Sequence, residues 1–323
     1  MCLKATSSVT SARHRLLRVR GVTLVELVVT LLVLAVIAVV AAVALRDPIR
    51  GYVDSTRRAQ LTDVADTALR RVARDIRLAL PNSVRVTGGG PIYLELLLTK
   101  TGGRYRSQDN GASGGIILDF TKTNTCFDTL GSMSAISGQA VAANDILVVN
   151  NLFSASTVTT SNAYTYGQAA YCGSTNVQTC NTTAISSTGA GSGTCAAAIL
   201  GNETRINFAT RQFPFSSPGN RFQVVSGPVT YVCSDNGGAL DASGNGTGTL
   251  TRVSGYTIQL TQPTGTYAGS PTTALLAQNV SSCAITYTPA LTQDIGLVSM
   301  RLAITRGNEA VNLYHEVHVS NIP

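Results

Sequence analysis

The amino-acid sequence predicts an α+β protein in which one long N-terminal helix packs on a β-rich, antiparallel head. Three patterns support this prediction. An almost unbroken apolar run covers residues 27–45, an amphipathic pattern with helical spacing continues to residue 80, and short apolar runs separated by turns follow from residue 82. The first two patterns indicate one helix with two different environments, and the third indicates a sheet.

The apolar run is long enough to cross a membrane. Leu27 to Leu45 spans nineteen residues, of which Thr30 alone is polar, and a helix of that length extends roughly 28 Å. The residues up to Gly21 contain five basic side chains and no acidic one. By the positive-inside rule, the N-terminus stays in the cytoplasm and the rest of the chain crosses the membrane.

Glu26 places a carboxylate at the start of this lipid-compatible segment, where a charge costs at least ~2.5–3.5 kcal/mol on insertion scales. A conventional signal cleaved after Ala44, or an uncleaved signal anchor, leaves that charge unexplained. Cleavage after Gly21 instead frees an amine on Val22, about one helical turn away. With an effective dielectric constant near 20, such a pair at ~4 Å is worth about 4 kcal/mol before desolvation. We therefore favour cleavage after Gly21.

Residues 21–27, with the sequence GVTLVEL, resemble the prepilin motif of type IV pilins and type II secretion pseudopilins. The resemblance implies that prepilin peptidase cleaves after Gly21 and N-methylates Val22. It also implies that Glu26 pairs with the N-terminus of a neighbouring subunit during assembly. The family's usual first mature residue is Phe, so Val22 departs from the pattern, and methylation there is a weaker expectation than cleavage.

Further segments are similar to the O-type minor pilins of the mannose-sensitive haemagglutinin (MSHA) pilus: 51–54, 68–77, 80–85, 93–97, 103–106 and 315–321. This resemblance implies a structural subunit without enzymatic activity, assembled into or at the tip of a filament. Its implied partners are prepilin peptidase, other minor and major pilins, the inner-membrane assembly platform and inner-membrane lipid. A J-type minor pseudopilin of type II secretion is the alternative within the superfamily. A membrane-anchored periplasmic enzyme or binding domain is the alternative of another class.

These observations predict four regions along the chain. Residues 1–21 form a cytoplasmic prepilin leader, 22–47 the transmembrane half of the helix, 48–81 its amphipathic half, and 82–323 a periplasmic head of the type IV pilin-like kind. Residues 154–198, rich in Ser, Thr and Gly, are expected to form a surface insertion in the head.

The amphipathic half has a single apolar stripe at three- and four-residue spacing. Its members are Leu61, Val64, Ala65, Ala68, Leu69, Val72, Ile76 and Leu80. On the opposite face, the four-apart spacing predicts ion pairs of Asp66 with Arg70 and of Arg71 with Asp75. We expect a bend at Pro48 and the end of the helix at Pro81.

The head is predicted to consist of strands and turns with no helix. Strands are expected at 92–98, 115–120, 145–149 and 228–232. The strongest alternation lies at the C-terminus, where residues 298–305 and 311–319 predict an antiparallel hairpin around a turn at 306–309.

Seven cysteines occur, and Cys2 lies in the predicted leader. The six others suit up to three disulfides in an oxidising compartment: Cys126, Cys172, Cys180, Cys195, Cys233 and Cys283. Fifteen connectivities are possible. The short separation of Cys172 and Cys180 allows a local bridge.

Other chemistries find little support in the sequence. Removing residues 1–21 leaves nineteen basic against seventeen acidic side chains, which is too balanced for a nucleic-acid footprint. His315 and His318 would point to opposite faces of a strand. The segment that begins at Asp241 resembles a calcium loop, but the position of its bidentate ligand holds Arg252, so a hairpin loop is favoured. We expect neither a metal nor a cofactor nor a catalytic centre.

Overall fold

The computed structural model describes residues 21–109, 114–133, 135–155, 157–172, 178–292 and 294–323. The predicted leader lies outside the described residues except for Gly21. The chain divides into two compact units, residues 1–55 and 56–323. A long N-terminal helix and a large, almost entirely antiparallel sheet confirm the α+β class.

Helix α1 (Leu24–Arg77) continues through Pro48 without interruption. A single helical turn, α2 (Ala169–Cys172), lies in the head, where no helix was expected. The strands are β1 (Arg85–Thr87), β2 (Ile92–Arg104), β3 (Asn124–Asp128), β4 (Ile146–Val148), β5 (Gln178–Thr179), β6 (Thr182–Thr188), β7 (Arg205–Gln212), β8 (Arg221–Ser234), β9 (Gly248–Tyr256), β10 (Gly269–Thr292), β11 (Ile295–Arg306) and β12 (Glu309–Ser320).

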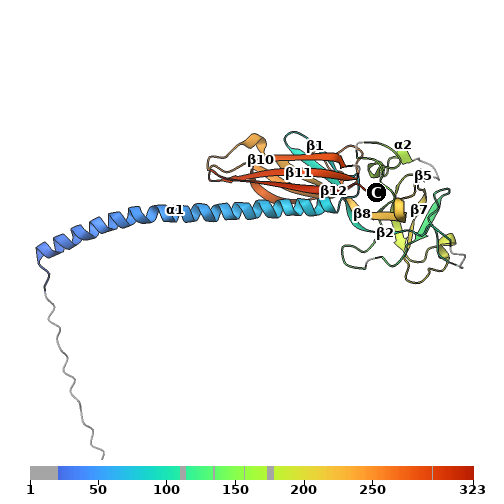
Figure 1. Cartoon of the computed structure of the whole chain (residues 1–323), viewed down its shortest axis with the longest axis horizontal. Helices are drawn as coiled ribbons and strands as arrows, with labels where there is room; N and C mark the ends of the chain where they lie inside the picture. The colour runs from blue at the N-terminus through green and yellow to red at the C-terminus, as the bar shows by residue number, and fades with distance from the viewer. Residues whose placement is uncertain (1–20, 110–113, 134, 156, 173–177, 293) are drawn as a thin grey trace, which may run out of the picture. The chain divides into compact units, whose positions relative to one another are not determined.

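In the second unit, the C-terminal part of α1 lies along β10, β11 and β12 (Figure 1). The predicted stripe supplies this contact, and Ala65, Val72 and Ile76 are almost completely buried in it. Val64 is the exception, with 42 % of its surface exposed. The helix also ends at Arg77, earlier than predicted, because the chain bends into the sheet and Ala79 bridges to Leu98 of β2.

The sheet runs in the order β12-β11-β10-β9-β8, and β8 continues along β2 on its other side. Helix α1 covers one face of this part, and the apolar side chains between them form the largest core. All neighbouring pairs here are antiparallel. The sequential strands β8 to β12 therefore form a meander built from short-range connections.

The C-terminal hairpin matches its prediction in detail. Strands β11 and β12 pair from Ile295↔Ser320 to Arg306↔Glu309 without a register shift. The two turn residues, Gly307 and Asn308, both have positive φ, as a two-residue hairpin turn with right-handed strand twist requires. Every second residue of β12 faces the helix side, and the residues between are exposed.

A second lobe comprises β3, β4, β5, β6 and β7 with the adjoining ends of β2 and β8. Its core is aromatic: Phe127 contacts the rings of Tyr105, Phe208 and Phe222 at centroid distances of 5.2 to 6.3 Å. This lobe has its own apolar cluster, separate from the one under α1.

The structure differs from the expected surface insertion at 154–198. This segment supplies β5 and β6, and its Tyr164 and Ile185 are buried in the head. The Tyr164 hydroxyl donates a hydrogen bond to the Ser83 carbonyl at 2.9 Å. The guanidinium carbon of Arg85 lies 3.7 Å from the centroid of the Tyr164 ring. The segment is mostly small and polar, but a few of its large residues are buried in the head. Its average composition does not predict their burial.

The prediction of a strand at 115–120 is wrong. These residues belong to no strand, because their hydrogen bonds go to scattered partners. The Ile116 N–H donates to the Asp128 side chain at 2.8 Å, and the Leu118 N–H donates to the Arg106 carbonyl at 2.9 Å. The remaining expected strands correspond to β2, β4 and β8, with shifted ends.

Candidate functional site

The N-terminal part of α1 exposes apolar side chains on all sides. Its described side chains from Leu24 to Arg46 are all exposed, and the large hydrophobic ones keep about half or more of their surface free. The segment has a mean hydropathy of 3.2 over eighteen residues. An apolar surface of this extent needs a cover. This helix is long and apolar enough to span a membrane.

Glu26 lies in the first turn of α1, where a carboxylate also interacts favourably with the helix dipole. Its backbone N–H donates to the Thr23 hydroxyl at 3.2 Å. Thr23 therefore caps the helix, and Glu26 is the third helical residue and the last of a Thr-x-x-Glu capping sequence. The sequence analysis missed this cap. Gly21 and Val22 precede the helix in non-helical backbone and are exposed.

No ion-pair partner reaches the Glu26 carboxylate within the described part of the chain. The cations nearest to it in sequence lie among residues 1–20, outside the described residues. The negative charge of Glu26 therefore lies on an exposed apolar helix, and no described residue neutralises it. If this helix spans a membrane, the carboxylate needs a partner there.

Asp75 joins α1 to the head by polar contacts inside an apolar interface. Its carboxylate accepts hydrogen bonds from Tyr231 of β8 at 2.7 Å and from Arg252 of β9 at 2.8 Å. Burial, with Asp75 as a neighbour, raises the pKa of Tyr231 far above its ordinary value. The prediction of Asp75 on the solvent face is therefore wrong, although its pair with Arg71 exists at 3.8 Å. The Asp66–Arg70 pair is confirmed at 2.8 Å.

Glu95 of β2 is the most deeply buried acid next to the helix-covered core. It accepts hydrogen bonds from Arg85 at 2.7 Å and from Tyr256 at 3.0 Å. Burial raises the pKa of the Glu95 carboxyl, and the neighbouring Arg85 opposes that change. These two hydrogen bonds join β2 to Arg85 of β1 and to Tyr256 of β9.

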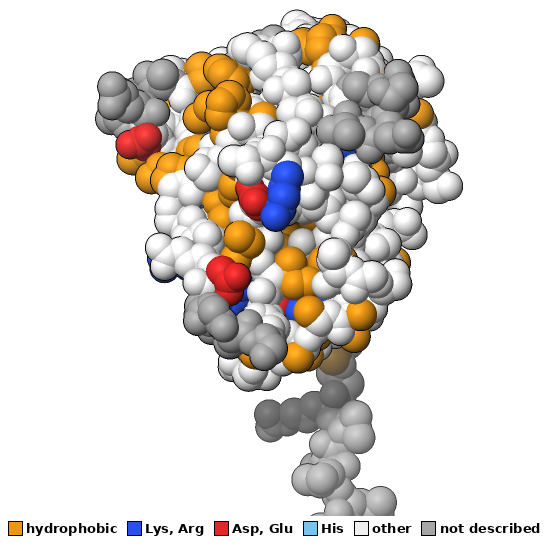
Figure 2. Space-filling model, turned by 90° about the vertical axis from the view of Figure 1, so that its right-hand side faces the viewer, with side chains coloured by type: hydrophobic (Ala, Val, Ile, Leu, Met, Phe, Trp, Pro, Cys, Tyr) orange, Lys and Arg blue, Asp and Glu red, His pale blue; other side chains and the backbone are white. Residues whose placement is uncertain are grey.

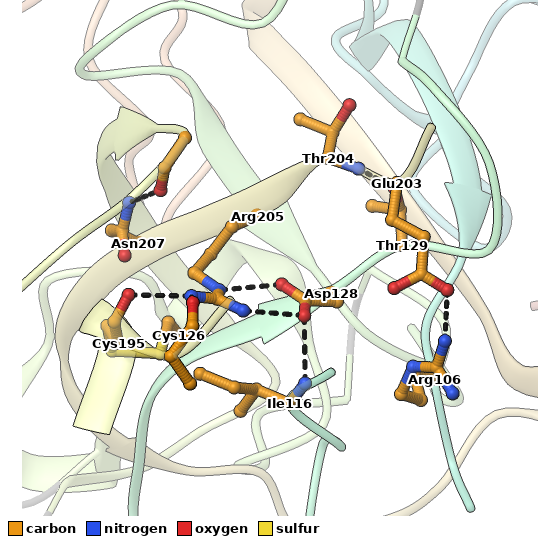
Figure 3. Close-up of polar contacts among 12 residues, drawn as sticks. Arg106, Ile116, Cys126, Asp128, Thr129, Cys195, Glu203, Thr204, Arg205 and Asn207 are labelled. Atoms are coloured by element: carbon orange, nitrogen blue, oxygen red, sulfur yellow. Dashed lines mark hydrogen bonds and ion pairs between the residues drawn. A yellow bond between two sulfur atoms is a disulfide. The ribbon is translucent and has the colours of Figure 1, made fainter. Parts of the chain in front are cut away.

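A second buried ion pair organises the second lobe (Figure 3). Arg205 of β7 donates to both carboxylate oxygens of Asp128, each at 2.7 Å, and both side chains are completely buried. Its remaining donors reach the carbonyl oxygens of Cys195, Ala197 and Ala198. Every donor group of Arg205 is thus satisfied. Sequence reasoning missed this pair because nothing local connects positions 77 residues apart.

The six cysteines of the head form three disulfides: Cys126–Cys195, Cys172–Cys180 and Cys233–Cys283. The last joins β8 to β10, and the first joins β3 to the segment before β7. The local bridge suggested by spacing is present. Such a set is typical of an oxidising compartment outside the cytosol.

The other candidate ligands lie apart. His315 faces the α1 side of β12 and His318 is exposed on the opposite face. Among the described residues, no group forms a hydrogen bond with the buried Nε2 atom of His315. Asp241 accepts from the N–H groups of Ser243 and Asn245 within a tight turn, and Arg252 lies in β9. The described residues hold no cluster of metal ligands.

Searches against protein-family models, curated proteins and solved structures found no match to this chain.

Proposed function

We propose that this chain is a minor pilin-like structural subunit of a type IV, MSHA-type pilus. In this proposal, prepilin peptidase cleaves after Gly21, the helix holds the subunit in the inner membrane, and the head lies in the periplasm. The subunit is then extracted and assembled into or at the tip of the filament. Its action consists of contacts with other pilins and with the assembly platform, without catalytic turnover.

One observation carries the proposal: Glu26 is a charged residue at the start of an exposed apolar helix, and no described residue pairs with it. A liberated Val22 amine on the same or a neighbouring helix supplies the missing positive charge. Apolar side chains around the helix can contact lipid before assembly and neighbouring helices afterwards. The disulfide-rich head is consistent with export to an oxidising compartment.

The mature N-terminus tests the proposal directly. We expect mass spectrometry of the protein isolated from membranes to give an N-terminal peptide that begins with methylated Val22. A peptide beginning at Leu45 would indicate a conventional secretory signal. A protein that still begins at Met1 would indicate a plain membrane anchor. Either of these results contradicts the proposal.

The role of Glu26 is tested by Glu26→Ala. We expect the variant to be cleaved and retained in the membrane but absent from sheared filaments. Thr30→Ala is a matched control, because Thr30 is the other polar residue of the segment and its hydroxyl donates only to the Leu27 carbonyl, at 2.9 Å. Normal assembly of the Glu26→Ala variant would contradict the assigned role.

A further inference from the structure

The C-terminal part of α1 carries a row of arginines along one side. Arg70, Arg74 and Arg77 are spaced four and three residues apart, so they lie on one face of the helix. All three are exposed. They line an open groove of about 770 Å³ together with Asp66, Ala73, Leu78 and His315. Because Asp66 is the one acidic residue in this lining, the groove is positively charged.

Two of these arginines have no counter-charge. Arg70 pairs with Asp66 at 2.8 Å, whereas Arg74 and Arg77 form no ion pair among the described residues. By contrast, few charged side chains are seen at the end of the head that carries β5 and β7 (Figure 2). Cations near the C-terminus of a helix are favourable on their own, so the arginines alone do not indicate a ligand.

The second feature of this region is a free strand edge. Strand β12 is the last strand of the sheet and pairs only with β11 in the part of the chain that the structure describes. The residues that flank a two-residue turn form a hydrogen-bonded pair, here Arg306 and Glu309, and such pairs recur at every second residue. The backbone N–H and C=O groups of the residues between them therefore point away from β11: Ala310, Asn312, Tyr314, Glu316 and His318.

The groove and the free edge are neighbours. His315, which lines the groove, lies between Tyr314 and Glu316 of β12, and α1 runs along this strand (Figure 1). A strand added at the edge would turn every second side chain to the face that α1 covers, at intervals of about 7 Å. The three arginines are distributed over about 10 Å of helix. Alternate side chains of an added strand can therefore reach them.

We propose that this edge binds an extended acidic segment of a partner protein. The segment adds to β12 as a further strand and places alternate Asp or Glu side chains beside Arg70, Arg74 and Arg77. Main-chain hydrogen bonds supply affinity, and pairs of carboxylate with guanidinium select the sequence. Glu316 does not oppose this pairing, because its side chain lies on the face of β12 turned away from α1.

The partner is a different protein and not a second copy of this chain. Nowhere in the 323 residues are two acidic residues separated by a single residue, so the chain itself contains no strand with the required alternation. The inference concerns the head alone and does not depend on cleavage after Gly21.

Fluorescence anisotropy with labelled peptides tests the proposal on the full-length protein in detergent micelles, at constant ionic strength. The probe is a nine-residue peptide with four glutamates at alternate positions, separated by threonine and valine. We expect it to bind at least about 10-fold more tightly than a peptide with glutamine in place of glutamate, or one with its four glutamates consecutive. N-methylation of two neighbouring central residues keeps every charge but removes N–H groups from both edges of the peptide. It should weaken binding by about 10-fold or more.

Substitutions in the groove provide the complementary test. Arg74→Gln combined with Arg77→Gln should weaken binding of the glutamate peptide by about 10-fold, because two charge pairs at a partly exposed surface are lost. Arg301→Gln combined with Arg306→Gln is the matched control. It removes the same charge from exposed positions on β11 and should leave binding within about twofold.

Tyr314→Pro tests the strand edge itself. Proline removes an N–H group that points away from β11, so the bonds between β11 and β12 remain, but binding of the glutamate peptide should weaken by about 10-fold. Thermal unfolding shows whether this variant still folds, and the N-methylated peptide tests the same contact on the unaltered protein.

Equal binding of the glutamate and glutamine peptides, binding that is unchanged by N-methylation, or binding that survives the loss of Arg74 and Arg77 would overturn the proposal. Tighter binding of a single-stranded oligonucleotide would assign the groove to nucleic acid. Self-association that disappears in the double arginine variant would assign it to a second copy. Either of these two results also overturns the proposal.

Discussion

Asp75 of α1 accepts a hydrogen bond from Tyr231 of β8 at 2.7 Å, although 156 residues separate the two in sequence. Arg252 of β9 contacts the same carboxylate oxygen at 2.8 Å. The apolar stripe of α1 is buried in the core beside this contact. The Asp75 carboxylate adds directionality, because its partners lie at fixed positions on two neighbouring strands.

Replacing Asp75 by Asn should strongly destabilise the head. The variant keeps the shape of the side chain and one acceptor for Tyr231, but Arg252 loses its counter-charge in a largely buried position. Breaking such a pair typically costs 3–5 kcal/mol, and partial exposure places our expectation at about 3 kcal/mol. Chemical denaturation followed by the near-ultraviolet signal of the tyrosines measures the change.

Asp66→Asn is the control for that experiment. Its pair with Arg70 lies on the exposed side of the same helix, and we expect a loss of less than about 1 kcal/mol. Equal losses in the two variants would show that the contact of Asp75 with the head is unimportant.

The difference between these two carboxylates also shows how far the sequence could lead. Spacing along one helix predicted the Asp66–Arg70 pair and most of the buried stripe, because both are local properties of a 3.6-residue period. Helical spacing could not predict the burial of Asp75, because the strands that cover it lie more than 150 residues later in the sequence. The ion pair of Asp128 with Arg205 likewise depends on contacts between segments far apart in the sequence.

The β regions show the same division. Alternation correctly predicted the C-terminal hairpin, because its strands are adjacent and half-buried. The segment 115–120 is also apolar, but no continuous strand pairs with it. Its apolar pattern therefore gave a wrong strand prediction. Residues 154–198 were expected at the surface because their composition is polar. Their few large residues, such as Tyr164, nevertheless reach the interior.

The stability of the head should fall with rising pH through a window set by Glu95. Burial raises the pKa of this carboxyl in the folded state, so the folded protein binds the proton more tightly than the unfolded chain does. Stability therefore decreases from about the ordinary value of 4.5 up to the raised pKa and then levels off. Glu95→Gln should remove this part of the pH dependence.

Unfolding free energies measured from pH 4.5 to 7 in wild type and Glu95→Gln check the expectation through their slopes. Glu316→Gln serves as the comparison, because Glu316 is exposed on β12 and its replacement should leave the slope unaltered. Parallel curves for wild type and Glu95→Gln would contradict the prediction.

The three disulfides should contribute unequally to stability. Cys233–Cys283 closes a separation of 50 residues and Cys172–Cys180 one of 8. In the chain-entropy model, these loops correspond to roughly 4 and 2.5 kcal/mol. Replacing both cysteines of each bridge by Ser and comparing urea unfolding midpoints tests the order. A larger loss from the short loop would show that local strain or packing, and not loop length, dominates.

The effects of the helix cap and of the Glu26 charge can be measured separately. The Thr23 hydroxyl accepts a hydrogen bond from the Glu26 backbone N–H and does not use the carboxylate. Thr23→Val should remove the cap, at a cost of about 1 kcal/mol to the first turn, yet preserve filament assembly. Glu26→Gln keeps the backbone bond and the size of the side chain but removes the charge, so under the proposed function it should abolish assembly. Immunoblots of sheared filaments and of membranes measure both effects. If the two variants lose assembly equally, residue 26 acts by starting the helix, and the charge pairing with Val22 is wrong.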